Sequence, residues 1–152
     1  MSGLAVFDND DTLVNGQSQR LFLSFLRRKG VVSSSVYFKI SLWFLFYKLG
    51  FYQNPKKIMG YAFGFLKGWP VEKMDSLVDE FFKTTLKNKI YVKGIDEIKK
   101  HQTANHEILL VSNAIEPIIK KIAGFLNVTN YVCTELEVTN GKYTGKIMGL
   151  LS

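Results

Sequence analysis

The chain has 152 residues, 47% of them hydrophobic and 22% charged, which is enough for one domain with a buried core and too apolar for a disordered chain. Its formal net charge is +7, and its one cysteine, Cys133, excludes an intrachain disulfide or a zinc site with several thiolates. The lone cysteine, and a start without the basic and apolar regions of a signal peptide, predict a reducing, cytoplasmic location.

Positive charge and aromatic side chains are concentrated in one segment. Between Thr12 and Val71 nine residues are basic and none is acidic, whereas all 13 acidic residues lie outside these bounds. The same segment holds 14 of the 21 aromatic side chains. Such a local excess of positive charge favours an anionic partner.

The first half of the chain predicts one strand followed by helices. The apolar run at 4–7 indicates a buried parallel strand, and the C-terminal end of such a strand is where α/β sheets bind ligands. Apolar residues at helical spacing, separated by short turns, then predict a bundle of four helices. One helix ends at Gly30, one covers about 36–49, one starts at Asn54-Pro55 and one follows Pro70.

The second half alternates between helices and strands. The pattern predicts, in chain order, a helix over 94–102, a strand over 107–112, a helix over 115–126 and a strand at 131–133. Asn140-Gly141, between two segments of strand character, predicts a tight β-hairpin.

These elements define the fold class and the domain organisation. We expect an α/β fold with a Rossmann-like parallel-sheet core formed by residues 1–13 and 91–152. A cap made of α-helices is inserted into this core over residues 14–90. No internal repeat or low-complexity segment interrupts the pattern.

The polar stretch Asp8-Asn9-Asp10-Asp11-Thr12 directly follows the first strand and carries the most informative chemistry. Carboxylates two positions apart at a strand end can point toward one ligand. One aspartate can attack a phosphate ester as a nucleophile, and a second can protonate the departing alcohol. An acidic turn that caps a helix is the structural alternative.

Three segments together resemble the haloacid dehalogenase superfamily of hydrolases. Val-Phe-Asp-Asn-Asp-Asp-Thr-Leu (6–13) is similar to its first motif, and Leu-Val-Ser-Asn-Ala (110–114) to its second. The final Leu-Glu-Val-Thr-Asn-Gly-Lys-Tyr-Thr-Gly-Lys-Ile (136–147) resembles the hairpin of the phosphoserine-phosphatase-like branch, the subfamily IB type. That branch also places a helical cap between the first two motifs.

The resemblance implies a role for each matching residue in a magnesium-dependent phosphate monoester hydrolase. Asp8 is the nucleophile and a Mg²⁺ ligand, and Asp10 is the general acid and base, with its backbone carbonyl on the metal. Ser112, Asn113 and Asn9 are expected to bind the substrate phosphate. In the same loop, Thr12 is expected to shape the turn and Asp11 falls at a variable position.

Two family motifs have no match in this chain. The resemblance implies a later lysine that steadies the phosphate and an acidic motif that completes the magnesium site, and both belong beyond the hairpin. Lys142 and Lys146 lie in the hairpin, and Lys120 and Lys121 lie in the helix after Ser112, so none matches that lysine. The sequence therefore predicts a core whose C-terminal part is missing. The alternative function is a non-catalytic protein that binds phosphate or an anionic membrane.

The basic, aromatic insertion has two interpretations. Its aromatic side chains form the core of the cap, or residues 36–52 contact an anionic membrane peripherally, being too short to span a bilayer. The second interpretation suits a lipid phosphate as the substrate. The other candidate substrate is a small phosphoserine-like ester. Nucleic acid is not an expected partner, because no stacking platform or known binding module is present.

Overall fold

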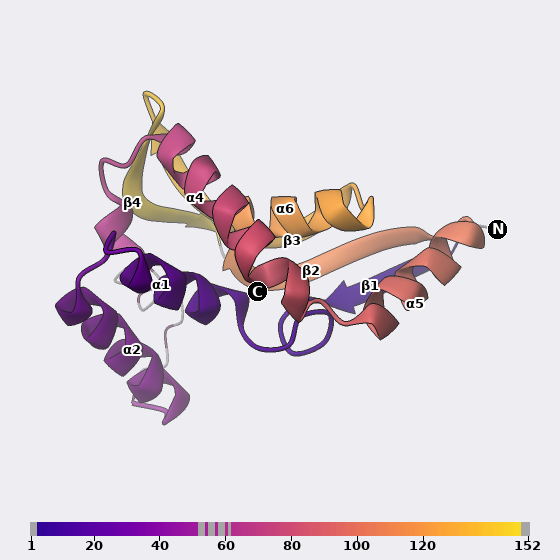
Figure 1. The fold of residues 1–152 in the computed structure, drawn as a ribbon, viewed down its shortest axis with the longest axis horizontal. Helices are drawn as coiled ribbons and strands as arrows, with labels where there is room; N and C mark the ends of the chain where they lie inside the picture. Colours follow the sequence, from indigo (N-terminus) through magenta and orange to yellow (C-terminus); the bar gives the residue numbers. More distant parts are fainter. Residues whose placement is uncertain (1–2, 52–53, 55–56, 58–59, 61, 150–152) are drawn as a thin grey trace.

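The computed structural model describes residues 3–51, 54, 57, 60 and 62–149. It confirms an α/β fold built on one four-stranded sheet, in the order β1-β2-β3-β4 (Figure 1). The first three strands are parallel, and the fourth is antiparallel to the third. The strands are β1 (Leu4–Asp8), β2 (Glu107–Ile115), β3 (Asn130–Thr139) and β4 (Lys142–Gly149).

Two helices connect the parallel strands: α5 (Val92–Thr103) precedes β2 and α6 (Glu116–Leu126) follows it. They cover one face of the sheet, where Ile108 and Leu110 are buried. On the other face the side chains of Leu4 and Val6 are 63% and 58% exposed, since no described element covers them. The predicted strand is therefore present, but the prediction that it is buried is wrong for this face.

The helices between β1 and α5 form a separate layer beside the sheet (Figure 1). Their core is aromatic: the Phe81 ring is fully buried and lies 5.1 Å from the Phe22 ring and 5.4 Å from the Phe25 ring. The helix predicted to start at Asn54-Pro55 lies mostly outside the described residues. The described elements are α1 (Ser18–Arg28), α2 (Ser34–Lys48), η1 (Gly64–Leu66), α4 (Val71–Thr84) and η2 (Leu86–Lys89).

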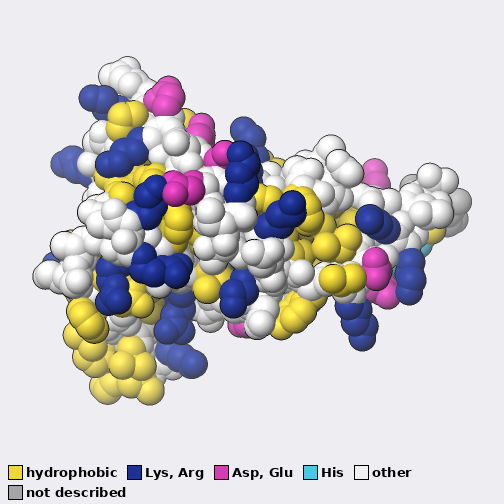
Figure 2. All heavy atoms as spheres, viewed as in Figure 1, with side chains coloured by type: hydrophobic (Ala, Val, Ile, Leu, Met, Phe, Trp, Pro, Cys, Tyr) yellow, Lys and Arg dark blue, Asp and Glu magenta, His cyan; other side chains and the backbone are white. Residues whose placement is uncertain are grey.

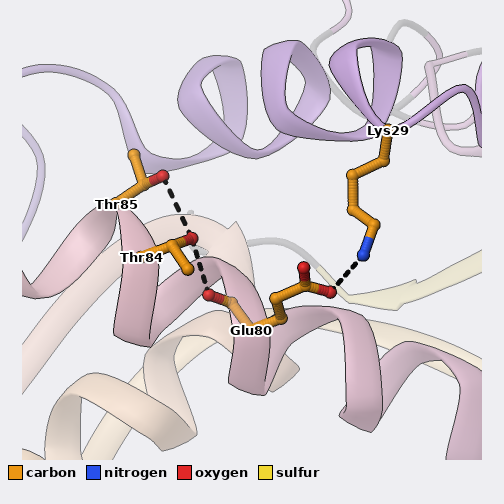
Figure 3. A network of polar contacts seen from close by, with 4 residues as sticks. All are labelled: Lys29, Glu80, Thr84 and Thr85. Carbon is orange, nitrogen blue, oxygen red and sulfur yellow. Dashed lines mark hydrogen bonds and ion pairs between the residues drawn. The ribbon is translucent and has the colours of Figure 1, made fainter.

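Polar contacts join neighbouring helices within this layer. Lys29, just after α1, forms an ion pair with Glu80 of α4, while within α4 the Thr84 hydroxyl donates to the Glu80 carbonyl at 2.8 Å (Figure 3). The pair is solvent-exposed, so the buried phenylalanines contribute more to the stability of the layer than these charges do.

The helical layer also contacts the core at two places. Helix α4 packs on α6, where Asp79 accepts from Lys121 at 2.6 Å and the rings of Phe82 and Phe125 lie 5.5 Å apart. The segment before α4 pairs with the hairpin, because Tyr143 donates its N–H to the Trp69 carbonyl at 2.9 Å. Both contacts fix the helical layer relative to the sheet.

Several boundaries differ from the predicted ones. Strand β2 continues to Ile115, three residues beyond its predicted end, with an irregular register between Val111 and Ile115. Strand β3 is ten residues long because it continues without a break into the predicted hairpin. The turn itself is confirmed: Asn140 and Gly141 have φ angles of 54° and 75°, which is the left-handed conformation that such two-residue turns require.

This turn leads to a stability prediction with a matched control. Gly141→Ala should lower the free energy of unfolding by about 1 kcal/mol, because alanine is strained at a positive φ. Gly124→Ala, in helix α6 with open space around the position, should raise it by about 0.5–1 kcal/mol. Urea unfolding of both variants measures the two changes, and changes of equal sign would contradict the turn assignment.

Candidate active site

Asp8 lies at the C-terminal end of β1, as predicted. The strand places it opposite Val111 of β2, and the next residue, Asn9, donates its N–H to the Val111 carbonyl at 3.1 Å. The Asp8 side chain is exposed, so a carboxylate at the strand tip faces solvent beside the end of the neighbouring strand. A nucleophile must be accessible to its substrate in this way.

The loop after Asp8 is held by its own backbone and by the segment before α5. The carbonyl of Asn9 accepts from the N–H groups of Leu13 and Val14, both at 3.0 Å. The side chains of these two residues are buried, and Leu13 also accepts from the N–H of Tyr91 at 2.9 Å. The loop is therefore a tightly bonded turn that presents the carboxylates from a fixed backbone.

Three donors converge on one oxygen of Asp10. Its Oδ1 accepts from the hydroxyl of Ser18 at 2.7 Å, from the N–H of Ser18 at 3.0 Å and from Nδ2 of Asn9 at 3.0 Å. These bonds leave Oδ2 as the oxygen that can exchange a proton with a ligand. Ser18 is the first residue of α1, so the carboxyl group also lies at a helix N-terminus.

The pKa of Asp10 is raised above its ordinary value. Burial is the largest cause, since it disfavours the charged form, and the negative charge of Asp8 adds to it. The hydrogen bonds from Ser18 and Asn9 oppose both effects without cancelling them. A carboxyl group with a raised pKa retains its proton more readily, as a general acid must.

The second motif is connected to the first through helix α1. Gln19, beside Ser18 in the first turn, donates from Nε2 to the carbonyl of Asn113 at 2.6 Å. Thr134 of β3 donates its hydroxyl to the same carbonyl at 2.7 Å. The first turn of α1 therefore contacts both motifs and sets their relative positions.

The three predicted phosphate-binding residues lie in different environments. Ser112 is 2% exposed, and its Oγ accepts from the N–H of Ala114 at 3.0 Å, which leaves the hydroxyl proton for another acceptor. It does not cap α6, whose N-cap is Ile115. Asn113 is exposed at the strand end. Asn9 is fully buried and donates to Asp10, so its side chain positions the Asp10 carboxyl group.

The oxygen atoms at this strand tip fit a magnesium ion in part. Magnesium takes one or two carboxylates together with water and substrate phosphate, and the exposed Asp8 carboxylate, whose charge acts on Asp10, is a ligand of this kind. Within the described residues, no three His, Cys, Asp or Glu side chains cluster closely enough to hold a metal by themselves. The chain residues that would hold the ion are Asp8 and the carbonyl of Asp10.

Other titratable groups lie away from this site or are bonded elsewhere. Burial raises the pKa of the Cys133 thiol to about 12, with Glu116 and Glu135 adding to the effect, so the thiol is unreactive. His101 and His106 are half-buried and in contact, with 2.9 Å between their Nδ1 atoms. Lys121 is occupied by Asp79 of α4.

The sequence does not single out Ser18 and Gln19. Neither residue belongs to a motif, and both reach the site only because α1 starts next to the loop. A serine one or two positions after a glycine at a predicted helix start was the available signal, but such a serine is usually a helix cap. Here the N-cap is Gln17, and the serine hydroxyl is directed at Asp10.

Comparison with known sequences gives a family match over nearly the whole chain. The family model for the haloacid dehalogenase-like hydrolases matches residues 5–151. A probable phosphatase of Mycobacterium tuberculosis is 26% identical over 145 residues, which cover 94% of this chain and 50% of that protein. A histidinol-phosphatase of Neisseria meningitidis is 28% identical, covering 98% of this chain and 68% of that protein. The chain thus spans half to two thirds of these relatives' length.

Solved structures show the same fold at low sequence identity. A protein of unknown function from Bordetella pertussis Tohama I has a TM-score of 0.88 and 22% identity, over 98% of this chain and 68% of that one. A phosphoserine phosphatase with an analogue of its phospho-aspartyl intermediate has a TM-score of 0.65 and 23% identity, over 97% and 63% of the two chains. The chain belongs to the haloacid dehalogenase-like hydrolase family.

Proposed function

We propose that the protein hydrolyses phosphate monoesters through a phosphorylated aspartate, with Asp8 as the nucleophile. An Asp8 carboxylate oxygen forms a bond to phosphorus while the bond to the ester oxygen breaks. Asp10 donates its proton from Oδ2 to the departing alkoxide, which leaves as an alcohol. Asp10, now a carboxylate, accepts a proton from water as the water oxygen bonds to phosphorus, and inorganic phosphate leaves Asp8.

The observation that carries this proposal is the environment of Asp10. Its raised pKa suits proton donation, and the three donors on Oδ1 leave only the other oxygen for the transfer. Members of the family typically depend on magnesium, which would offset the charge repulsion between Asp8 and an anionic phosphate. Ser112 and Asn113, at the end of the adjacent strand, are the proposed phosphate-binding residues.

The proposed substrate is a small-molecule or lipid phosphate ester. Proteins with similar sequences are named as phosphatases, one of them for histidinol phosphate, and similar structures include phosphoserine phosphatases. A small phosphoserine-like ester is one candidate, and a lipid phosphate is the other, because the basic segment 12–71 carries no acidic residue that would repel an anionic substrate.

Phosphate release from a panel of monoesters tests the proposal. The panel contains phosphoserine, histidinol phosphate, a short-chain lipid phosphate and 4-nitrophenyl phosphate, each assayed with magnesium and with a chelator. Release that requires magnesium is the expected result. A protein that binds phosphate or vesicles, but releases no phosphate from any ester, would establish the non-catalytic alternative.

Ser18→Ala should shift the pH dependence of the reaction. The hydroxyl of Ser18 stabilises the Asp10 carboxylate and lowers its pKa, so its loss should raise that pKa further. Because the reaction needs protonated Asp10, activity should persist to higher pH. The alkaline limb of kcat/KM should move upward by about one pH unit.

Ser33→Ala is the matched control for this shift. Ser33 caps helix α2 by accepting from the N–H of Val36 at 3.2 Å, far from the carboxylates in the chain. Its replacement should lower the free energy of unfolding by about 1 kcal/mol and leave the pH profile unchanged. An identical shift in both variants would mean that Ser18 affects stability rather than the acid.

A further inference from the structure

Helix α2 combines an apolar sequence with an unusual degree of exposure. Its residues 40–47 are apolar on nearly every side, a pattern typical of helices that are buried all round. In this structure Ile40 is its only buried residue, and α2 lies at the edge of the molecule with α1 between it and the sheet (Figure 1). Several large apolar side chains of the helix are therefore uncovered.

The exposed apolar residues form one row, which we call the outer stripe: Phe38, Leu42, Leu45 and Leu49. Their side chains are between 49% and 65% exposed. Spacings of four, three and four residues place them on one side of the helix, at about 100° per residue. Ile40 and Phe44, on the opposite side, face an apolar cavity that α1 also lines, so α2 is anchored from behind.

Two lysines flank the outer stripe. At about 100° per residue, Lys39 lies roughly 90° to one side of the stripe and Lys48 roughly 90° to the other. Both side chains are exposed. Figure 2 shows a hydrophobic patch at the end of the molecule that carries α2, with Lys and Arg side chains beside it. An apolar row with a lysine on each side is the arrangement of a helix that lies in a membrane surface, with lysines reaching up to the headgroups.

The outer stripe could be covered by a membrane or by a second copy of the chain, and the charge distribution favours the membrane. The spacing of the stripe would also suit pairing of two α2 helices, with Lys39 and Lys48 at the flanking positions. Such a pair would bring like charges together, and no acidic residue between Thr12 and Val71 could offset them. Anionic lipid headgroups supply the missing negative charge.

We infer that the outer stripe of α2 docks on an anionic membrane surface, with Lys39 and Lys48 on the headgroups. The inference is independent of the proposed hydrolysis. Among the described residues, no helix has both the length and the apolarity needed to cross a bilayer.

Co-sedimentation with vesicles tests the inference. At low salt the protein should sediment with vesicles of phosphatidylglycerol and phosphatidylcholine but not with phosphatidylcholine alone, and added salt should weaken the binding. The triple variant L42S/L45S/L49S should bind at least about a hundredfold more weakly. The matched control V92S/V138S/M148S replaces three exposed apolar residues of the α/β part of the molecule, outside the outer stripe. It should bind as the unaltered protein does.

A pair of charge variants separates specific contacts from net charge. K39Q/K48Q should weaken binding by about tenfold or more, whereas K93Q/K146Q, with the same loss of two charges on the core, should have little effect. Absence of binding to anionic vesicles, or equal binding to both vesicle types, would overturn the inference. So would a dimer in sedimentation velocity that the triple variant dissociates, since the stripe would then contact a second copy.

Discussion

Asp8→Asn should reduce phosphate release by at least about 10³-fold, because an amide cannot form the acyl phosphate on which the proposed reaction depends. The substitution keeps the size of the side chain at an exposed strand tip, so the fold should be unaffected. Stopped assays of phosphate release over hours, with magnesium and an excess of the best ester from the panel, measure the remaining rate.

Asp11→Asn is a matched control for this loss. It makes the same change of charge and shape in the same loop, but Asp11 is exposed and has a left-handed φ of 58°, which asparagine also tolerates. Its rate should stay within about twofold of the unaltered protein. Equal losses in the two variants would mean that the charge of the loop matters, and Asp8 would no longer be the nucleophile.

The parts of the fold that the sequence predicts correctly depend on local chemistry. Strand β1, helix α4 after Pro70 and the turn at Asn140-Gly141 each follow from residues within a few positions of one another. The extension of β2 to Ile115 was missed because its last residues contact Thr134 of β3, and a pairing between distant strands leaves no local pattern. The exposure of Leu4 and Val6 was missed for the same reason, since their apolarity alone indicates burial.

In the candidate site, too, local sequence predicts some features and contacts between distant residues determine the others. Asp8 and Asp10 are recognisable because their spacing after a strand belongs to one motif. What makes Asp10 a plausible acid, however, is its burial and the donors that Ser18 brings from eight residues further along the chain. The contact between Gln19 and Asn113 joins residues 94 positions apart and could not be predicted from either motif. The sequence singles out the two carboxyl groups, and the packing of α1 sets the environment of Asp10.

The Asp10→Asn variant should separate the two halves of the proposed reaction. Asparagine can still accept from Ser18 through its amide oxygen, so the loop should keep its shape, but it can neither donate a proton to the ester oxygen nor accept one from water. With an alkyl phosphate such as phosphoserine, whose leaving group needs that proton, the rate should fall by about 10²–10⁴-fold.

With 4-nitrophenyl phosphate, Asp10→Asn should give a different time course. Its leaving group departs without a proton, so Asp8 can still be phosphorylated, whereas hydrolysis of the phosphorylated aspartate still lacks its base. Rapid mixing should therefore show a burst of nitrophenolate equal to the amount of protein, followed by a slow steady rate, and Asp8→Asn should show no burst. If Asp10→Asn lost the same factor with both esters and gave no burst, Asp10 would not be the group that transfers protons. If the burst appeared in Asp8→Asn as well, another residue would carry the phosphoryl group.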